Sequence, residues 1–257
     1  MHSPDNYIVG GGFFVRHSVL PVSLAWKAFE EKNGVDSSEI LRKRVVDLGR
    51  RTETDPFIGC TILAEPFFFP REMWIKVPDD WKSNIVVGKT YDTSVGEGVR
   101  VWQQVQERLS IKSVGYDQHY KVADLYGNEY LTRARLGQGA FRVLVTDAYT
   151  RRCAITGERT LPVLEAGNIK PFAEGGPNRI YNGLLFRSDL HILFDRGYMT
   201  ITPDYHVNVS RRIKEEFDNG RHYYALEGKK LEVLPQNMID QPSREFIEWH
   251  NQQRFLV

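Results

Sequence analysis

Residues 153–198 read CAITGERTLPVLEAGNIKPFAEGGPNRIYNGLLFRSDLHILFDRGY. In this stretch LPVLEAGNI is an apolar run that predicts a strand ending before Pro171, and FAEGGPNRIYNG is a loop of turn-forming residues. The segment SDLHILFDRG predicts a short helix, with Ser188 or Asp189 as its N-cap and Gly197 as its stop. The order strand, loop, strand, helix decides the fold of this half of the chain.

The predicted helix carries an imidazole and a carboxylate one turn apart. His191 and Asp195 are four positions apart, so both side chains project from one helical face. A histidine nitrogen and a carboxylate oxygen on one face can hold a divalent cation. The alternative is that His191 is packed or solvated and that Asp195 caps the helix or forms a salt bridge. With the polar residue Asn168 at the end of the first strand, the pattern outlines a hydrolase site with one metal ion.

The segment resembles the HNH (ββα-metal) endonuclease family, specifically members that read roughly LEAAHIKP, then NGLLL, then DLHxLFDRG. Asn168, Asn182 and His191 follow one another at the spacing of the three signature positions. The match is contiguous and extends to RLGQGAFR and RCAITG before it. The resemblance implies hydrolysis of DNA phosphodiesters with Mg²⁺ or another divalent cation such as Mn²⁺.

The family's signature residues have separate roles, which the resemblance carries over position by position. The first histidine activates water, the middle asparagine braces the loop, and the last histidine binds the metal. In this sequence Asn182 is the brace, His191 is a metal ligand, and Asp195 is a second ligand by helical geometry. Asn168 occupies the first catalytic position, where an amide has no group that takes a proton near neutral pH.

Two departures from the family pattern bear on activity. Asn168 is explained either by an engineered exchange that keeps intact DNA bound, or by a naturally degenerate nuclease that acts as a nucleic-acid-binding module. We favour the first interpretation because the other signature positions are intact. The second departure is Gly167, where many HNH sites have a metal-binding aspartate. Glu165 has the same strand parity and is a candidate substitute.

The first half of the chain predicts a small α+β module. YIVGGGFFV and FIGCTILAEPFFF read as strands, and SLAWKAFEEKNG and SSEILRKRVVDLGRR between them read as helices. These runs, with FFFPREMWIKVPDDW and GKTYD, resemble the PUA-like superfamily with its EVE- and SRA-type readers. The resemblance implies a small β-barrel with helices. Only a few residues precede the first predicted strand, which is consistent with a missing N-terminal strand.

PUA-like readers commonly hold a modified base, flipped out of the duplex, between aromatic side chains. Most tryptophan and phenylalanine side chains serve as core, so only part of this chain's aromatic set is expected in such a pocket. The candidates for the modified-base pocket are Trp26, Trp74, Phe14, Phe68, Trp81 and Tyr91.

Arginines gather just before the signature segment. From Arg133 to Arg152 there are five arginines and one acidic residue, Asp147. A basic stretch can contact DNA phosphates, although a solvated helix face explains the same charges equally well. The candidates for phosphate contacts are Arg142, Arg151, Arg152 and Lys170.

The composition restricts the class of protein. The formal net charge is +1, and Cys60 and Cys153 are the two cysteines in 257 residues. They lie far apart, which argues against a disulfide scaffold and a CxxC zinc site. The sequence has no apolar run of about 20 residues, as a membrane span requires, and no secretory signal at its N-terminus. We therefore expect a cytoplasmic protein with no membrane partner.

These observations predict an α+β protein in three parts: a PUA-like modified-base reader at 1–98, a linker region at 99–135 and an HNH nuclease domain at 136–257. The predicted function is a modified-cytosine-dependent DNA endonuclease that serves restriction and phage defence, inactive or impaired in this copy because Asn168 occupies the position of the general base. Its partner is double-stranded DNA, and a homodimer is expected because cutting both strands usually takes two single-site nucleases. In a further alternative the first half is only a dimerisation module, with no preference for modified DNA.

Overall fold

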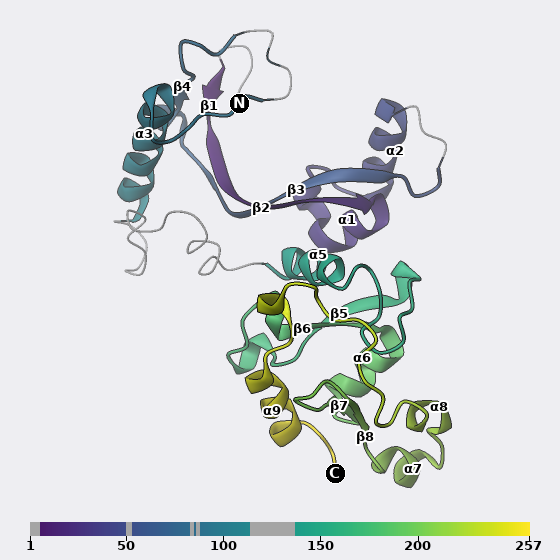
Figure 1. Cartoon of the computed structure of the whole chain (residues 1–257). Coiled ribbons are helices and arrows are strands. Elements are labelled where there is room, and N and C mark those ends of the chain that lie inside the picture. The colour runs from purple at the N-terminus through teal and green to yellow at the C-terminus, as the bar shows by residue number, and fades with distance from the viewer. Residues whose placement is uncertain (1–5, 50–52, 83–84, 86–87, 114–136) are drawn as a thin grey trace. The chain divides into compact units, whose positions relative to one another are not determined.

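The computed structural model describes residues 6–49, 53–82, 85, 88–113 and 137–257. Helices and strands are mixed in it, as expected for an α+β chain (Figure 1). The chain forms two compact units, Met1–Arg16 with Leu63–Arg135, and His17–Ile62 with Leu136–Val257. These units differ from the three-part division of the sequence, which stays a prediction.

The first unit contains a short strand pair and a long helix. β1 (Tyr7–Ile8) is antiparallel to β4 (Ile75–Lys76). α3 (Gly96–Ser113) packs beside β4, and Phe69, Ile75 and Val105 are buried at the centre of the cluster. The helix α3 thus begins inside the predicted reader and continues into the predicted linker. The rest of that linker lies outside the described residues.

Two long strands pair with each other. They are β2 (Gly10–Pro21) and β3 (Phe57–Phe68). The glycine run in β2 permits a close approach, because a Cβ on Gly10 would lie 2.3 Å from the carbonyl oxygen of Phe67. In the part of the chain that the structure describes, every sheet has two strands. The predicted small β-barrel is therefore not closed there, because β1 and β4 pair with each other instead of extending the β2–β3 pair.

Residues from both halves of the sequence build the second unit. α1 (Val22–Phe29) and α2 (Ser38–Gly49) pack around the buried side chains of Val22, Val35 and Leu41. α1 also lies against α5 (Gln138–Ala148). The two helices expected for a separate reader thus pack in the unit that holds the signature segment.

The signature segment folds as its pattern predicts. β5 (Leu164–Asn168) is antiparallel to β6 (Gly183–Arg187), and α6 (Ser188–Asp195) follows directly and packs on both strands. Gly197, with a φ of 76°, allows the chain to turn after α6. The predicted strand, loop, strand and helix are confirmed, but the N-cap of α6 is Arg187 and not Ser188 or Asp189, because the helix already begins at Ser188.

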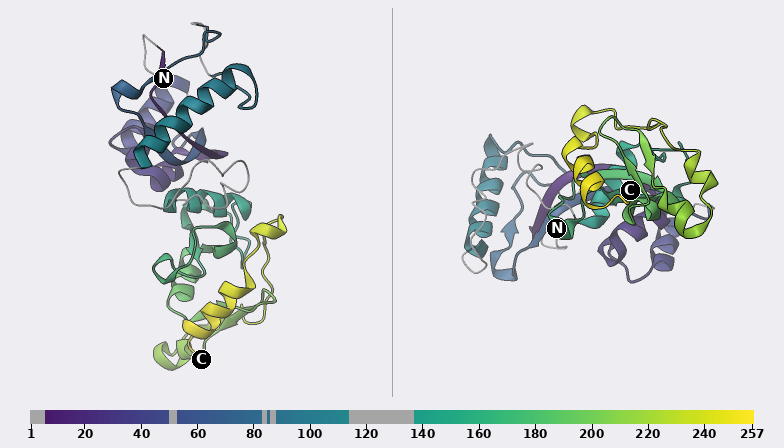
Figure 2. Two further views of the ribbon diagram at one scale, coloured as in Figure 1. Left: turned by 90° about the vertical axis from the view of Figure 1, so that its left-hand side faces the viewer. Right: turned by 90° about the horizontal axis from the view of Figure 1, so that it is seen from below.

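The remaining elements complete the second unit. β7 (Met199–Ile201) pairs with β8 (Val207–Val209), and α9 (Arg244–Gln253) packs on β7; Figure 2 shows α9 in yellow beside these green strands. In the described ranges, no helix combines the length and the apolar content that crossing a membrane requires. The other short helices are α7 (Arg212–Phe217), α8 (Arg221–Tyr224), η1 (Glu30–Asn33), η2 (Arg71–Met73), η4 (Leu161–Val163), η5 (Phe172–Glu174), η6 (Ile180–Asn182) and η7 (Met238–Asp240).

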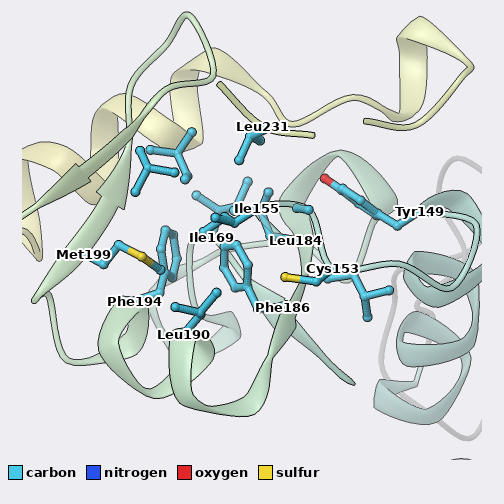
Figure 3. Packing of buried hydrophobic residues seen from close by; sticks show 14 of the residues in the cluster. Tyr149, Cys153, Ile155, Ile169, Leu184, Phe186, Leu190, Phe194, Met199 and Leu231 are labelled. Carbon is cyan, nitrogen blue, oxygen red and sulfur yellow. The ribbon is translucent and has the colours of Figure 1, made fainter. Parts of the chain in front are cut away.

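The core of the second unit surrounds β6. Leu184, Leu185 and Phe186 are consecutive and all 0 % exposed, so both faces of this strand are covered. Figure 3 shows Phe186 and Phe194 among the side chains of this core, and their ring centroids lie 5.2 Å apart. β6 leads directly into α6, so this packing holds the helix that carries His191 and Asp195.

His250 connects α9 to α6 from inside the core. Its Nε2 lies 3.1 Å from the Phe194 carbonyl oxygen, its Nδ1 lies 2.7 Å from the Thr200 hydroxyl, and its ring stacks on Phe194. Burial lowers the pKa of His250 from its ordinary 6.5 to about 4. The folded protein therefore holds this imidazole neutral at pH values where the unfolded chain protonates it.

We expect the core to depend on Phe186. Phe186→Ala should lower the free energy of unfolding by about 3–5 kcal/mol, because it removes a fully buried ring and leaves a cavity. Denaturant unfolding followed by fluorescence measures the change. Phe217→Ala, which removes a ring that is 61 % exposed, is the matched control and should cost much less. Equal losses for the two variants would contradict this description of the core.

Acid should destabilise the second unit through His250. The pKa of His250 is lower in the folded state, so stability is complete above the unfolded pKa of 6.5 and falls as the pH drops toward about 4. The loss should be roughly 3 kcal/mol. Thermal or denaturant unfolding between pH 7 and 4 measures it. His250→Gln should flatten this part of the profile, whereas His222→Gln, an exposed control, should leave it unchanged.

Candidate active site

The β5–β6 register and α6 bring three of the predicted residues to one cavity. Asn168 at the end of β5 lies opposite Gly183, the residue after Asn182. A cavity of about 570 Å³ opens here, and Asn168, His191 and Asp195 line it. Asn182 is fully buried beneath the loop between the strands. The structure thus places the four predicted catalytic and metal residues at one end of the strand pair.

The His191 ring lies between two carboxylates. Its Nδ1 is 2.8 Å from Glu165 Oε2, and its Nε2 is 3.4 Å from Asp195 Oδ2. A carboxylate at Nδ1 favours the tautomer with hydrogen on that nitrogen, which leaves the Nε2 lone pair on the side of Asp195. A carboxylate that holds the far nitrogen in this way is the usual support of a metal-binding histidine.

The spacing of His191 and Asp195 fits one divalent cation. Two adjacent ligands of an octahedral ion, each about 2.1 Å from it, lie about 3 Å apart, close to the 3.4 Å between Nε2 and Oδ2. Among the described residues, no three His, Cys, Asp or Glu side chains are arranged around one ion. Water and a substrate phosphate would then complete the shell, as Mg²⁺ commonly requires. Glu165, the candidate substitute ligand, instead contacts the other nitrogen of His191.

The Asp195 carboxyl has a perturbed environment. Burial raises its pKa above the ordinary value, His191 opposes this shift, the nearby Glu165 carboxylate adds to it, and Arg254 opposes it. The Asp195 side chain is nevertheless 55 % exposed, so an ion in the cavity can reach its carboxylate.

Gly167 is required by the position of the His191 ring. A Cβ at Gly167 would lie 2.5 Å from Nε2 and 2.6 Å from Cδ2 of that ring. Any side chain there would displace the imidazole. The absence of the family's aspartate at this position thus has a steric reason, because the ring occupies the space that the aspartate would need.

Asn182 is bound on three sides by backbone groups of the loop. Its Oδ1 accepts a hydrogen bond from Lys170 N, and its Nδ2 donates to the carbonyl oxygens of Lys170 and Pro177, all at 2.9 Å. These contacts fit the predicted brace. Asn168 is at the start of the same loop, and its Nδ2 is 3.5 Å from Asn178 Oδ1.

The predicted phosphate contacts have different surroundings. Arg142 lines the cavity, and Lys170 lies over the Trp249 ring at 5.5 Å. Arg151 donates to the Val19 carbonyl and pairs with an aspartate of α5, while Arg152 pairs with Glu232 at 2.5 Å. Arg151 and Arg152 thus hold parts of the unit together.

Arg254 is a site residue that the sequence did not reveal. It lines the cavity and lies 5.9 Å from the Trp249 ring, on which Lys170 also sits. It also pairs with Glu174 of the loop. The only signal in the sequence was the segment WHNQQRFLV, which has the character of a terminal helix and no motif.

The aromatic candidates do not gather in one compact unit. Trp26 belongs to the second unit and packs against its α1–α2 cluster. Trp74 packs in the core of the first unit, where its Nε1 donates to the Phe69 carbonyl at 3.1 Å. The others in the first unit are Phe14 (58 % exposed), Phe68 (70 % exposed), Trp81, which is partly buried, and Tyr91, whose hydroxyl donates to Asp80 at 2.7 Å.

A methyl group at Gly167 should disturb the site without unfolding the unit. Gly167→Ala is expected to push the His191 ring away and break its hydrogen bond to Glu165. Mn²⁺ binding should weaken about 10- to 100-fold, and the Nδ1–H signal of His191 should shift in ¹⁵N NMR spectra. Gly137→Ala adds the same methyl group in open space and should change neither measurement. Unchanged Mn²⁺ affinity in Gly167→Ala would contradict the assigned ring position.

Removing the brace should loosen the loop. Asn182→Ala leaves buried backbone groups of Lys170 and Pro177 without a partner, at about 1–3 kcal/mol for each group. The amides of residues 169–178 should exchange with solvent faster, while those of β6 stay protected. Hydrogen exchange read by mass spectrometry makes this comparison. Uniform loss of protection across the unit would show a general folding role for Asn182 instead.

A match to one protein family agrees with this geometry. The family model described as HNH endonuclease matches residues 153–202. No curated protein matches the chain. A solved structure titled "Modification dependent TagI restriction endonuclease" is similar in part, with 21% identity, a TM-score of 0.35, and coverage of 51% of this chain and 44% of that chain. This chain thus spans less than half of that protein. Residues 153–202 of the present chain are an HNH endonuclease domain.

Proposed function

We propose that this protein is a DNA endonuclease that cuts DNA carrying modified cytosine and hydrolyses phosphodiesters with one divalent cation. The observation that carries the proposal is the His191 ring, supported at Nδ1 by Glu165 and facing Asp195 through Nε2 in a cavity that Asn168 also lines. This combination suits phosphodiester hydrolysis, because it can hold a cation and leaves room for a phosphate.

Each residue of the site has a distinct role in this proposal. His191 and Asp195 would hold the ion, which when bound stabilises negative charge on the phosphate and on the leaving 3′ oxygen. Glu165 keeps the imidazole oriented, and Asn182 keeps the loop in place beside it. The guanidinium of Arg142 attracts the DNA backbone to the cavity. Together these groups bind and orient the scissile phosphate.

The side chain at position 168 is the one that would accept a proton from the attacking water. The Asn168 amide cannot accept that proton, and loss of a general base typically costs a factor of about 10²–10⁴ in rate. If Asn168 is an engineered exchange, the site remains that of an endonuclease; if it is natural, the second candidate function is a nucleic-acid-binding module whose nuclease domain no longer cuts. The two candidates share the same DNA-binding cavity and differ only in turnover.

The choice of modified cytosine is supported by the sequence resemblance of the first 98 residues to PUA-like readers. In the same proposal two copies act as a homodimer, one for each strand, and the setting is cytoplasmic restriction of phage DNA. If the first half serves only for dimerisation, plain and modified DNA should be cut equally.

Replacing the amide with an imidazole tests the proposal directly. Asn168→His should raise cleavage by about 10²–10⁴-fold in Mg²⁺ or Mn²⁺. The substrates are duplexes of one sequence with plain, 5-methylated or 5-hydroxymethylated cytosine, analysed on denaturing gels. The double variant Asn168→His with His191→Ala is the control and should remain inactive.

The pattern of cleavage by Asn168→His distinguishes the endonuclease from the nucleic-acid-binding module. Cutting of modified duplexes alone supports the proposed enzyme, and equal cutting of all duplexes rejects the modified-base preference. If Asn168→His binds DNA but cuts none of the duplexes, the endonuclease proposal fails and the binding module replaces it.

A further inference from the structure

Two cations lie over one tryptophan ring beside the active-site cavity. The Lys170 ammonium lies 5.5 Å and the Arg254 guanidinium 5.9 Å from the centroid of the Trp249 ring. Arg254 also lines the cavity that His191 and Asp195 line. An aromatic face attracts cations without neutralising them, so this ring keeps both groups in place and leaves them positively charged.

The backbone of Arg254 is fixed against the end of the helix that carries the proposed metal ligands. Its N–H donates to the His250 carbonyl oxygen at 2.9 Å, at the end of α9. Two residues later, Leu256 N donates to the carbonyl oxygen of Gly197, just after α6, also at 2.9 Å. A Cβ on Gly197 would lie 2.1 Å from the Arg254 carbonyl oxygen, so this approach requires the glycine. The Arg254 side chain therefore extends from a backbone that is held relative to α6.

The Arg254 guanidinium uses few of its hydrogen-bond donors. It pairs with the carboxylate of Glu174 in the loop after β5. The two side chains are 40 % and 41 % exposed, and ion pairs with this exposure contribute little to stability. A guanidinium has five N–H donors, and within the described ranges this one donates only to Glu174. Most of its donors are therefore available to a second anion, and the present pair is easily exchanged.

A phosphate of a DNA strand is the anion that fits this position. A guanidinium binds carboxylate and phosphate oxygens through the same planar set of donors, so a phosphate can replace the Glu174 carboxylate. The Lys170 ammonium, which forms no ion pair in the described part of the chain, adds a second charge on the same ring. Arg142 lines the same cavity, so a polyanion is favoured over a single small anion because its successive phosphates meet cations at both places.

We propose that Arg254 and Lys170 form a subsite for the DNA phosphate next to the scissile one, and that the Glu174 carboxylate occupies this subsite until DNA binds. The phosphate replaces Glu174 on the guanidinium, while Trp249 keeps both cations at the cavity. Arg254 then holds the strand so that the scissile phosphate faces the proposed cation site. This inference rests on the proposed function and adds a DNA contact with which a carboxylate of the same chain competes.

Equilibrium binding of DNA to the full chain tests the exchange without cleavage. A short fluorescent duplex with 5-methylcytosine is titrated in EDTA at several salt concentrations, and its anisotropy is measured. Arg254→Ala should weaken binding about tenfold and lower the slope of log affinity against log salt by about 1. Glu174→Gln should strengthen binding about two- to fivefold, because the competing carboxylate is gone. In the double variant this gain should disappear, since no guanidinium remains to be released.

The exposed pair of Arg244 and Asp204 provides the matched control. Arg244 belongs to the same helix α9, its Nη2 lies 3.9 Å from Asp204 Oδ1, and neither residue lines the cavity. Arg244→Ala and Asp204→Asn should leave the affinity and the salt slope nearly unchanged. Thermal unfolding shows whether each variant is folded. If Arg254→Ala is misfolded, Arg254→Gln replaces it, because glutamine keeps most of the stem and loses the charge.

Three results would overturn the subsite: no binding of the duplex by the wild-type chain, a wild-type affinity and salt slope in the Arg254 variant, or a gain from Glu174→Gln that persists without Arg254. The last result would show general charge repulsion in place of an exchange. If Asn168→His cuts DNA while the Arg254 variant binds normally, the subsite alone is rejected. If Asn168→His fails to cut while the predicted binding changes are observed, the endonuclease is rejected and the subsite stands.

Discussion

The hydrogen bond between Glu165 and His191 is the interaction on which the rest of the site depends. It joins β5 to α6, and it determines which imidazole nitrogen is free. Gly167 must lack a side chain because the His191 ring covers it. With Nδ1 engaged, Nε2 and the Asp195 carboxylate form the pair that fits a cation. A displacement of either element by about one ångström would separate that pair.

Packing keeps the two elements in place. The consecutive buried residues of β6 hold β5 on one side and lead without a loop into α6, so the helix cannot shift without disturbing the core. His250 adds a connection from α9 to the last turn of α6 through the Phe194 carbonyl. The hydrogen bonds of the Asn182 side chain to Lys170 and Pro177 likewise hold the loop that begins at Asn168. Hydrogen bonds therefore fix both the helix and the loop, and the proposed phosphodiester hydrolysis depends on such positioning.

The local parts of this arrangement were predictable from sequence. The positions of His191 and Asp195 follow from helical periodicity, and the turn at Gly197 follows from its freedom to adopt positive φ. The role of Glu165 was not predictable, since strand parity places it on a face but does not say which nitrogen it meets. Arg254 reaches the cavity only through tertiary packing of the C-terminal residues, for which no local pattern exists.

In the first half of the chain, even more of the structure depends on tertiary contacts that local sequence patterns do not predict. Periodicity located the helices around Trp26 and Leu41, but the packing of α1 against α5 depends on contacts between distant residues. Apolar and aromatic runs marked β2 and β3 but could not say how many strands join them, and no closed barrel forms within the described residues. The aromatic candidates were chosen by residue type alone, and type does not distinguish a core ring such as Trp74 from a ligand-binding one.

Pulsed electron paramagnetic resonance of Mn²⁺ bound with DNA to the full chain tests the central claim most directly. With ¹⁵N-labelled histidine, the account predicts coupling to one directly bound imidazole nitrogen, lost in His191→Ala and retained in the exposed control His222→Gln. Coupling that survives His191→Ala, or no imidazole coupling in the wild-type chain, would contradict the account, because His191 would then not be the residue that holds the ion.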